Sequence, residues 1–276
     1  MLRTIKITFL LIAGFSLFTS LNAQSSFFEL GGAHLYKKAG IISTSNDASS
    51  IYFNPAGLTN LTSITGDISY NRRYNLAQLS TVSLGVAKPT NLGVFGASVV
   101  QYGYENYSET KAGLTYARKL FDILSVGATF DYLRYDAGIY GNKNLFTFEV
   151  GAQTQITESL TLGVFVFNPG NLSITENRDV PGKMAFGLAY QAGKKVKVHT
   201  ELSKTIDREA EIKIGLDYQI MDNIFLSAGS NFTNFAYSYG VTYYSPLGVN
   251  LSFAGINDQR LGSSLALSVF YQKQTY

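Results

Sequence analysis

The sequence of 276 residues has no cysteine, no tryptophan, only five prolines and only 15% charged residues. Without cysteine, the chain can form neither a disulfide framework nor a thiolate metal site. Average soluble domains carry about 25% charged residues, so a chain this weakly charged is expected to collapse rather than stay disordered. The net charge of +3 is too small for a basic nucleic-acid-binding surface, and no nucleic-acid partner is expected.

Long apolar runs are also scarce, and the only one lies at residues 7–21. Arg3 and Lys6 precede this run, and the small residue Ala23 follows it. The run is short for a helix that crosses a ~30 Å hydrocarbon core, so residues 1–23 are predicted to be a cleaved signal peptide. No other stretch reaches 18 apolar residues, which argues against a helical membrane protein. The mature chain is therefore expected to be exported.

What the sequence does contain is glycine, tyrosine, phenylalanine and a persistent alternation of apolar and polar residues. Ile212, Ile214 and Leu216, for example, alternate with Lys213 and Asp217. A period of two predicts β-strands with two chemically different faces. The alternation alone fits both a soluble β-sandwich, whose apolar faces form a core, and a membrane barrel, whose apolar faces contact lipid.

The arrangement of turns separates these two folds. The predicted strands are 63–73, 77–88, 93–104, 108–119, 124–135, 144–156, 160–168, 182–192, 195–204, 210–220, 224–233, 236–245, 248–257 and 263–274. One set of alternate connections is short, at 88–91, 120–123, 157–159, 221–223 and 245–248. The other set includes the long ones, at 135–144, 168–182, 205–211 and 256–263. Short periplasmic turns, longer outer loops and an even strand number are typical of bacterial barrels. Residues 63–276 are therefore predicted to form an all-β fold, a 14-stranded antiparallel transmembrane β-barrel.

Residues 24–62 do not alternate cleanly and are rich in serine, glycine and asparagine. Within them, the stretch SNDASSIYFNPAGLTNL at 45–61 resembles the hatch segment of the FadL outer-membrane family and its PorV/PorQ relatives. The resemblance implies that 24–62 is an N-terminal hatch inside the barrel lumen. Its signature residues would be Asp47, Ala48, Asn54, Pro55, Ala56 and Gly57.

The Asn-Pro-Ala-Gly part of this stretch also has a local interpretation. Pro55 fixes its own φ and favours an extended Asn54, while Gly57 can take a positive φ. These preferences predict a tight turn that anchors the hatch to the wall. An ordinary turn leading into the first strand is the alternative.

Nine glycines are predicted on the lumen side of the strands, at positions 85, 113, 127, 151, 163, 187, 215, 229 and 240. Glycine within a strand marks either close approach of another backbone or a bend. Room for a hatch and curvature of the barrel therefore remain two open explanations.

Fourteen tilted strands give a backbone diameter of about 28 Å, most of which a hatch and inward side chains would fill, so an open porin is not expected. The predicted lumen-facing charged residues are Lys111, Asp131, Glu149, Lys183, Lys195, Lys197, Glu201, Lys213 and Asp217. Because their signs are mixed, they favour internal salt bridges over an ion-selective path.

Two functions remain open. The short loops favour the PorV/PorQ side of the resemblance, which implies an accessory subunit of an outer-membrane secretion or assembly complex. Its partners would be membrane lipid and other secretion or assembly proteins. Candidate docking aromatics for such partners are Tyr102, Tyr104, Tyr107, Phe232, Phe235 and Tyr237. An aromatic girdle at the membrane interface would explain the same residues.

The alternative is FadL-like transport of hydrophobic small molecules such as fatty acids or aromatics, with such a molecule as ligand. FadL-like barrels use long outer loops for capture and a wall opening at a kink in strand three for exit. Here the loops are short, but strand 93–104 loses clean alternation at Val99 and Val100, after Gly93 and Gly96. This blurred pattern favours a β-bulge there.

Enzymatic activity is not expected. The chain has two histidines: His34 has no visible partner, and His199 lies four residues from Ser203 on one face of a predicted strand. Such positions are too far apart for direct contact between nucleophile and base. No catalytic residue, metal site or cofactor is predicted.

Overall fold

The computed structural model describes residues 31–121, 123–170, 172–175 and 178–272. The predicted signal peptide 1–23 and the first residues of the predicted hatch, 24–30, lie outside the described residues. Among the described residues, no helix is long and apolar enough to cross a membrane.

Fourteen long strands account for most of the chain. They are β1 (Thr65–Arg72), β2 (Ser80–Thr90), β3 (Gly93–Tyr104), β4 (Tyr107–Leu120), β5 (Leu124–Asp136), β6 (Asn142–Thr157), β7 (Leu160–Phe167), β10 (Lys183–Ala192), β11 (Val196–Thr205), β12 (Glu211–Met221), β13 (Ile224–Asn231), β14 (Ala236–Tyr243), β15 (Val249–Asp258) and β16 (Gly262–Tyr271). The remaining elements are α2 (Ala33–Tyr36), η2 (Ala48–Ile51), η3 (Pro55–Asn60), η4 (Arg73–Asn75), η5 (Ala77–Leu79), η6 (Gly138–Tyr140), β8 (Ser173–Thr175) and β9 (Arg178–Asp179).

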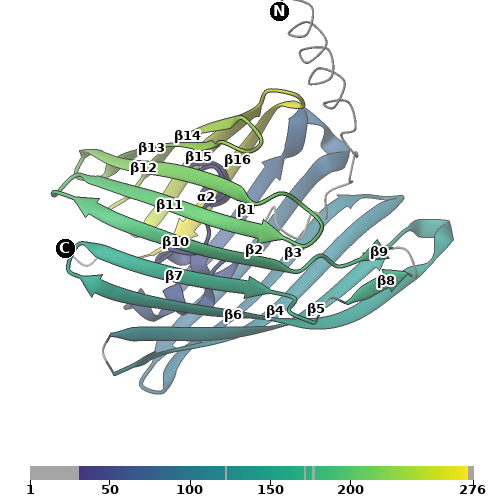
Figure 1. The fold of residues 1–276 in the computed structure, drawn as a ribbon, viewed down its shortest axis with the longest axis horizontal. Helices are drawn as coiled ribbons and strands as arrows, with labels where there is room; N and C mark the ends of the chain where they lie inside the picture. The colour runs from purple at the N-terminus through teal and green to yellow at the C-terminus, as the bar shows by residue number, and fades with distance from the viewer. Residues whose placement is uncertain (1–30, 122, 171, 176–177, 273–276) are drawn as a thin grey trace, which may run out of the picture.

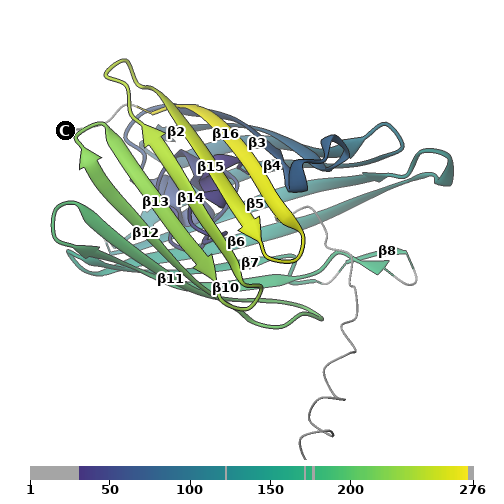
Figure 2. The same ribbon diagram turned by 90° about the horizontal axis from the view of Figure 1, so that it is seen from above.

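The long strands form one closed antiparallel barrel in chain order (Figures 1 and 2). The barrel closes where β1 pairs with β16, from Gly66 opposite Tyr271 to Arg72 opposite Leu265. Closure leaves no unpaired edge strand in the barrel. An unpaired edge would expose backbone N–H and C=O groups to hydrocarbon, where they have no hydrogen-bonding partner. The predicted 14-stranded fold is confirmed, and each predicted strand overlaps an observed one.

The two ends of the barrel differ in their connections. At one end, called the short-turn end, the connections are 91–92, 121–123, 158–159, 193–195, 222–223 and 244–248. At the other, called the long-loop end, they are 73–79, 105–106, 137–141, 168–182, 206–210, 232–235 and 259–261. The longest of them carries the small hairpin of β8 and β9, which lies past the end of β7 in Figure 1. The sequence did not predict this hairpin because its strands of three and two residues are too short for a period to be recognised.

The strands present apolar side chains outward and polar side chains inward. Ile214 is 42% exposed and Phe148 47% exposed, whereas their neighbours Lys213 and Glu149 are 3% and 2% exposed. Other exposed apolar residues around the wall are Ile68, Leu84, Leu114, Phe130, Phe186, Leu226, Tyr239, Phe253 and Leu267. An outer wall this apolar requires lipid around it, because a soluble sandwich would bury these rows against each other.

The β-bulge predicted in strand three is absent. β3 pairs with β2 and with β4 along its whole length without a register shift. Val99 is 48% exposed on the outer wall, while Val100 is 4% exposed in the lumen. The alternation looked blurred because an apolar residue occupies a lumen position, so the prediction was wrong.

Candidate functional site

Residues 31–62, called the hatch segment, lie inside the barrel, where α2 is visible between the strands in Figure 2. α2 contacts β14–β16, η2 contacts β1–β3, and η3 contacts β3–β6. All four residues of α2 and all four of η2 are buried. The hatch segment therefore contacts both the first and the last strands of the barrel.

Lumen-side glycines allow this close contact. A Cβ atom at Gly229 would lie 2.8 Å from the Lys38 carbonyl carbon, and one at Gly127 would lie 2.7 Å from the carbonyl carbon of Pro55. Real Cβ atoms do not approach backbone this closely, so any side chain there would displace the hatch segment. The predicted glycines that would meet the hatch segment are Gly85, Gly127, Gly151, Gly163, Gly187, Gly215, Gly229 and Gly240. Gly113 differs, because its Cβ would meet strand side chains instead.

The Asn54-Pro55 pair begins η3 and holds it to the wall. Asn54 is extended at φ −78° and ψ 107°, and its Oδ1 accepts a hydrogen bond from Ala56 N at 3.1 Å. Its Nδ2 donates to Ser43 O at 2.6 Å and to Val164 O on β7 at 2.9 Å. The fully buried amide therefore joins two parts of the hatch segment to a barrel strand.

Replacing Asn54 by alanine should lower the free energy of unfolding by about 2–3 kcal/mol, because it leaves buried hydrogen-bonding groups without partners. Urea unfolding of the full-length protein in detergent measures this loss. Asn60→Ala is the matched control, since exposed Asn60 makes one hydrogen bond, to Gly57 O at 3.1 Å, in the same helix. Equal losses in the two variants would contradict a special anchoring role for Asn54.

Gly57 is required for a different reason from the one the sequence indicated. Its φ is not positive; instead, a Cβ there would collide with Ser50 Oγ and with the backbone of Ser45. Pro55, Ala56 and Gly57 are all buried. The glycine thus permits two turns of the hatch segment to pack against each other.

Asp47 and Ala48 begin η2, the preceding helical turn. The carboxylate of Asp47 accepts a hydrogen bond from Ser49 N at 3.0 Å, and the backbone N–H of Ala48 donates to Gln272 Oε1 at 3.1 Å. Burial alone would raise the pKa of Asp47, but the charges of Lys37, His34 and Lys38 outweigh it and hold that pKa well below its usual range. Asp47 therefore stays ionised as an N-cap.

A carboxylate from the wall holds the middle of the hatch segment. Glu201 Oε2, from β11, accepts hydrogen bonds from Ile42 N at 2.8 Å, Ser43 N at 2.8 Å and Ser43 Oγ at 2.7 Å. Lys213, on β12, lies 3.4 Å from the other oxygen of Glu201 and donates to Gly40 O at 3.1 Å. The sequence placed Glu201 and Lys213 in the lumen but gave no sign of these partners.

On another part of the wall, Lys111 on β4 lies between two carboxylates. It forms a close ion pair with Glu149 and a 3.7 Å pair with Asp131, and all three side chains are buried. Burying charges is tolerable only where partners neutralise them. The buried lumen charges of β4, β5 and β6 therefore form ion pairs with one another.

The other predicted lumen residues lie in different surroundings. Lys197 and Asp217 are half-buried, and Lys183 is buried. Lys195 is a correction, because it lies in the exposed turn between β10 and β11 rather than on the lumen face of a strand.

Both histidines have acidic partners that the sequence did not reveal. His34 Nε2 lies 2.9 Å from Asp67 Oδ2 on β1, and His199 Nε2 lies 3.0 Å from Asp217 Oδ2. His34 and Asp67 are 33 residues apart, whereas His199 and Asp217 lie on the neighbouring strands β11 and β12; no local sequence pattern indicated either contact. Ser203 hydrogen-bonds Glu211 at 3.3 Å, so no Ser-His pair forms there.

An apolar cluster lies level with the Lys111 network, since Leu133 is the cross-strand neighbour of Lys111 and Phe167 is that of Glu149. Leu133, Phe165 and Phe167 contribute from the strands, and Ile174 and Val180 contribute from the loop with β8 and β9; all five are buried. Of the long loop, Ile174 and Val180 thus pack against this cluster.

The predicted docking aromatics do not form one surface. Tyr104, Phe232, Phe235 and Tyr237 are about half exposed or more, whereas Tyr102 and Tyr107 are half-buried. The hydroxyl of Tyr107 donates to Glu109 at 2.5 Å.

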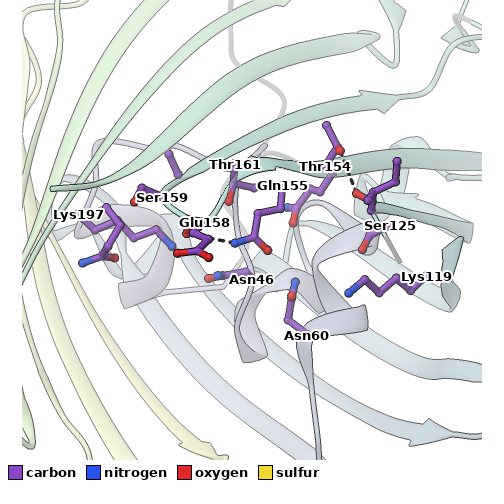
Figure 3. A pocket seen from close by; sticks show the side chains of 14 residues that line it. Asn46, Asn60, Lys119, Ser125, Thr154, Gln155, Glu158, Ser159, Thr161 and Lys197 are labelled. Atoms are coloured by element: carbon purple, nitrogen blue, oxygen red, sulfur yellow. Dashed lines mark hydrogen bonds between the residues drawn. The ribbon is translucent and has the colours of Figure 1, made fainter. Parts of the chain in front are cut away.

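Two polar cavities lie between the hatch segment and the wall near the short-turn end. The first has a volume of about 310 Å³ and is shown in Figure 3, where Asn46, Asn60, Lys119 and Lys197 approach it from several sides. The second has a volume of about 240 Å³ and shares Asn46, Gln191 and Lys197 with the first.

Comparisons with known proteins give structural matches only. No protein-family model and no curated sequence matches the chain. The toluene transporter TbuX of Ralstonia pickettii matches at a TM-score of 0.70 and 12% identity, over 90% of this chain and 99% of that chain. The toluene transporter TodX of Pseudomonas putida matches at 0.65 and 12%, over 89% and 98%.

A FadL homologue from Pseudomonas aeruginosa matches at a TM-score of 0.63 and 13% identity, over 88% of this chain and 98% of that chain. At such low identity the similarity establishes a FadL-like fold and nothing finer. TbuX and TodX are transporters, in agreement with the prediction that the chain is not an enzyme.

Proposed function

We propose that this protein is an outer-membrane barrel that lets small hydrophobic molecules cross the membrane. The observation that carries the proposal is the shared fold, because two of the matched barrels are toluene transporters. The apolar outer wall supports a membrane location. Export by an N-terminal signal peptide remains a prediction.

The apolar cluster at the long-loop end supports the same function. Phe165 and Phe167 of β7 belong to one buried apolar cluster with Ile174 and Val180 of the long loop, and such a lining is suited to an apolar molecule. Transport then requires the hatch segment to move, because it occupies the lumen and its residues Tyr52 and Leu58 belong to the same cluster. An exit through a gap at strand three is not proposed, since β3 is paired on both sides.

The fold comparison favours transport over the accessory-subunit role that the PorV/PorQ resemblance implied. The exposed aromatics Tyr104, Phe232, Phe235 and Tyr237 fit either a docking surface or a membrane-interface girdle. Extraction in mild detergent followed by mass spectrometry tests the accessory role, which requires a constant protein partner.

Uptake of toluene by cells that lack this protein should be several-fold slower than in the parent, and re-expression should restore it. Val180→Asp should also slow toluene uptake, because it places a charge in the apolar cluster. Asp179→Ala, at an exposed neighbouring position, is the control and should leave uptake unchanged. Unchanged toluene and fatty-acid uptake on deletion would refute the transport proposal.

A further inference from the structure

The second polar cavity has a marked excess of positive charge. Five lysines line it, Lys37, Lys38, Lys194, Lys195 and Lys197, against two carboxylates, Asp47 and Asp217. Lys37 and Lys38 come from the hatch segment, Lys197 from the lumen face of β11, and the other two from the turn at its rim. Three separate parts of the fold therefore direct cations towards one space.

The two carboxylates are already engaged. Asp217 accepts hydrogen bonds from Ser227 Oγ at 2.5 Å and pairs with His199 at 3.0 Å and with Lys38 at 3.4 Å. Asp47 caps η2 through Ser49 N, as described above. Neither carboxylate therefore neutralises the remaining lysines by direct contact.

Lys37 and Lys197 are the two lysines of this cavity that are neither exposed nor paired with a carboxylate. Neither forms an ion pair or hydrogen bond with any other of the described residues, although Lys37 is only 6% exposed and Lys197 is half-buried. Burial lowers the pKa of Lys37, against the opposing effect of Asp47. An ammonium group in this position is stabilised by an anion brought to it.

We propose that this cavity binds a small, water-soluble anion that carries carboxylate or phosphate groups. The charge excess supplies the attraction. The amide of Gln219 donates one N–H to Asp222 O at 3.3 Å and has a second N–H that can donate to the ligand. A volume of about 240 Å³ far exceeds the ~10–15 Å³ that a single water needs, so a small organic anion fits.

A soluble anion is favoured over a lipid headgroup because the lining residues belong to the hatch segment, to inward faces of strands and to a turn. A lipid would have to bring its acyl chains inside the wall to reach Lys37. Since the cavity opens at the short-turn end, which the sequence predicts to be periplasmic, the anion would come from the periplasm. The proposal does not depend on transport of hydrophobic molecules.

Isothermal titration of the full-length protein in neutral detergent, at low salt, tests the site with succinate and inorganic phosphate as separate probes. Saturable binding of at least one probe is expected, and Lys197→Gln should weaken it by about tenfold through loss of one charged hydrogen bond. Lys194→Gln with Lys195→Gln, at the rim, should weaken it less. Lys88→Gln is the matched control, because it removes an exposed charge on the outer wall near the same end.

Two outcomes would overturn the proposal. In the first, neither soluble probe binds, and binding of phosphatidylglycerol in nanodiscs at the lysines would then identify a lipid site instead. In the second, Lys88→Gln weakens binding as much as Lys197→Gln does. The heat-dependent gel mobility of each variant verifies that its barrel is folded, so a loss of binding reports on the site itself.

Discussion

The Gly163→Ala variant is expected to fold into a barrel in which the hatch segment is displaced from its position against β7. Gly163 lies on the lumen side of β7, and a Cβ there would come 2.7 Å from the carbonyl carbon of Ser43 and closer still to its oxygen. Backbone cannot rotate away as a long side chain can, so the hatch segment must shift. Overpacking of this kind costs about 1–3 kcal/mol and occasionally more.

Limited proteolysis followed by mass spectrometry measures this effect, with new cleavage expected within residues 31–62. Gly66→Ala is the matched control, because the nearest atom to a Cβ at Gly66 is 3.9 Å away, in another barrel strand. Heat-dependent gel mobility should show a folded barrel in both variants. A Gly163→Ala protein as resistant to protease as the Gly66→Ala protein would contradict the close contact described here.

The second large effect is expected from Glu201→Ala. The substitution removes the acceptor for Ile42 N, Ser43 N and Ser43 Oγ. It also leaves Lys213 with one carboxylate partner, Glu211 at 3.2 Å, in place of two. Breaking a buried ionic contact in this way costs about 3–5 kcal/mol, because the groups left behind remain buried without partners. The midpoint of urea unfolding should fall, and amide exchange at residues 40–44 should accelerate.

Glu201→Gln separates the hydrogen bonds from the charge. Its amide oxygen can still accept from the hatch segment, but its neutral side chain cannot pair with Lys213, so an intermediate loss is expected. Glu158→Ala, in the exposed turn at 158–159, controls for the removal of a carboxylate. If Glu201→Ala exchanged amides no faster than Glu158→Ala, the wall would not be holding the hatch segment through this residue.

The barrel was predictable because its signal is local. Ile212, Lys213 and Ile214 alternate within three residues, and the repeat sets which face of a strand meets lipid wherever the strand lies in the sheet. The same rule led to the wrong prediction of a β-bulge at Val99 and Val100, because an apolar residue at a lumen position produces the same local pattern as a shift in strand register.

The hatch contacts were not predictable in the same way. The glycine positions indicated that something comes close to the wall, or that the wall bends, and could not decide between the two. Only the folded chain shows that a Cβ at Gly229 would meet Lys38 and that one at Gly113 would meet strand side chains. The cavity with excess positive charge was likewise unseen, because Lys37 and Lys197 are 160 residues apart in the chain.

The amino-acid order by itself determined that this polypeptide forms an even-numbered antiparallel barrel with an apolar exterior, because period-two patterning acts over neighbouring residues. Tertiary structure alone decided which lumen groups meet: His34 with Asp67, Ser43 with Glu201, and Lys38 with Asp217. Those pairs depend on how a short irregular segment fits inside a closed wall. That fit depends on distances across the lumen, which no local repeat encodes.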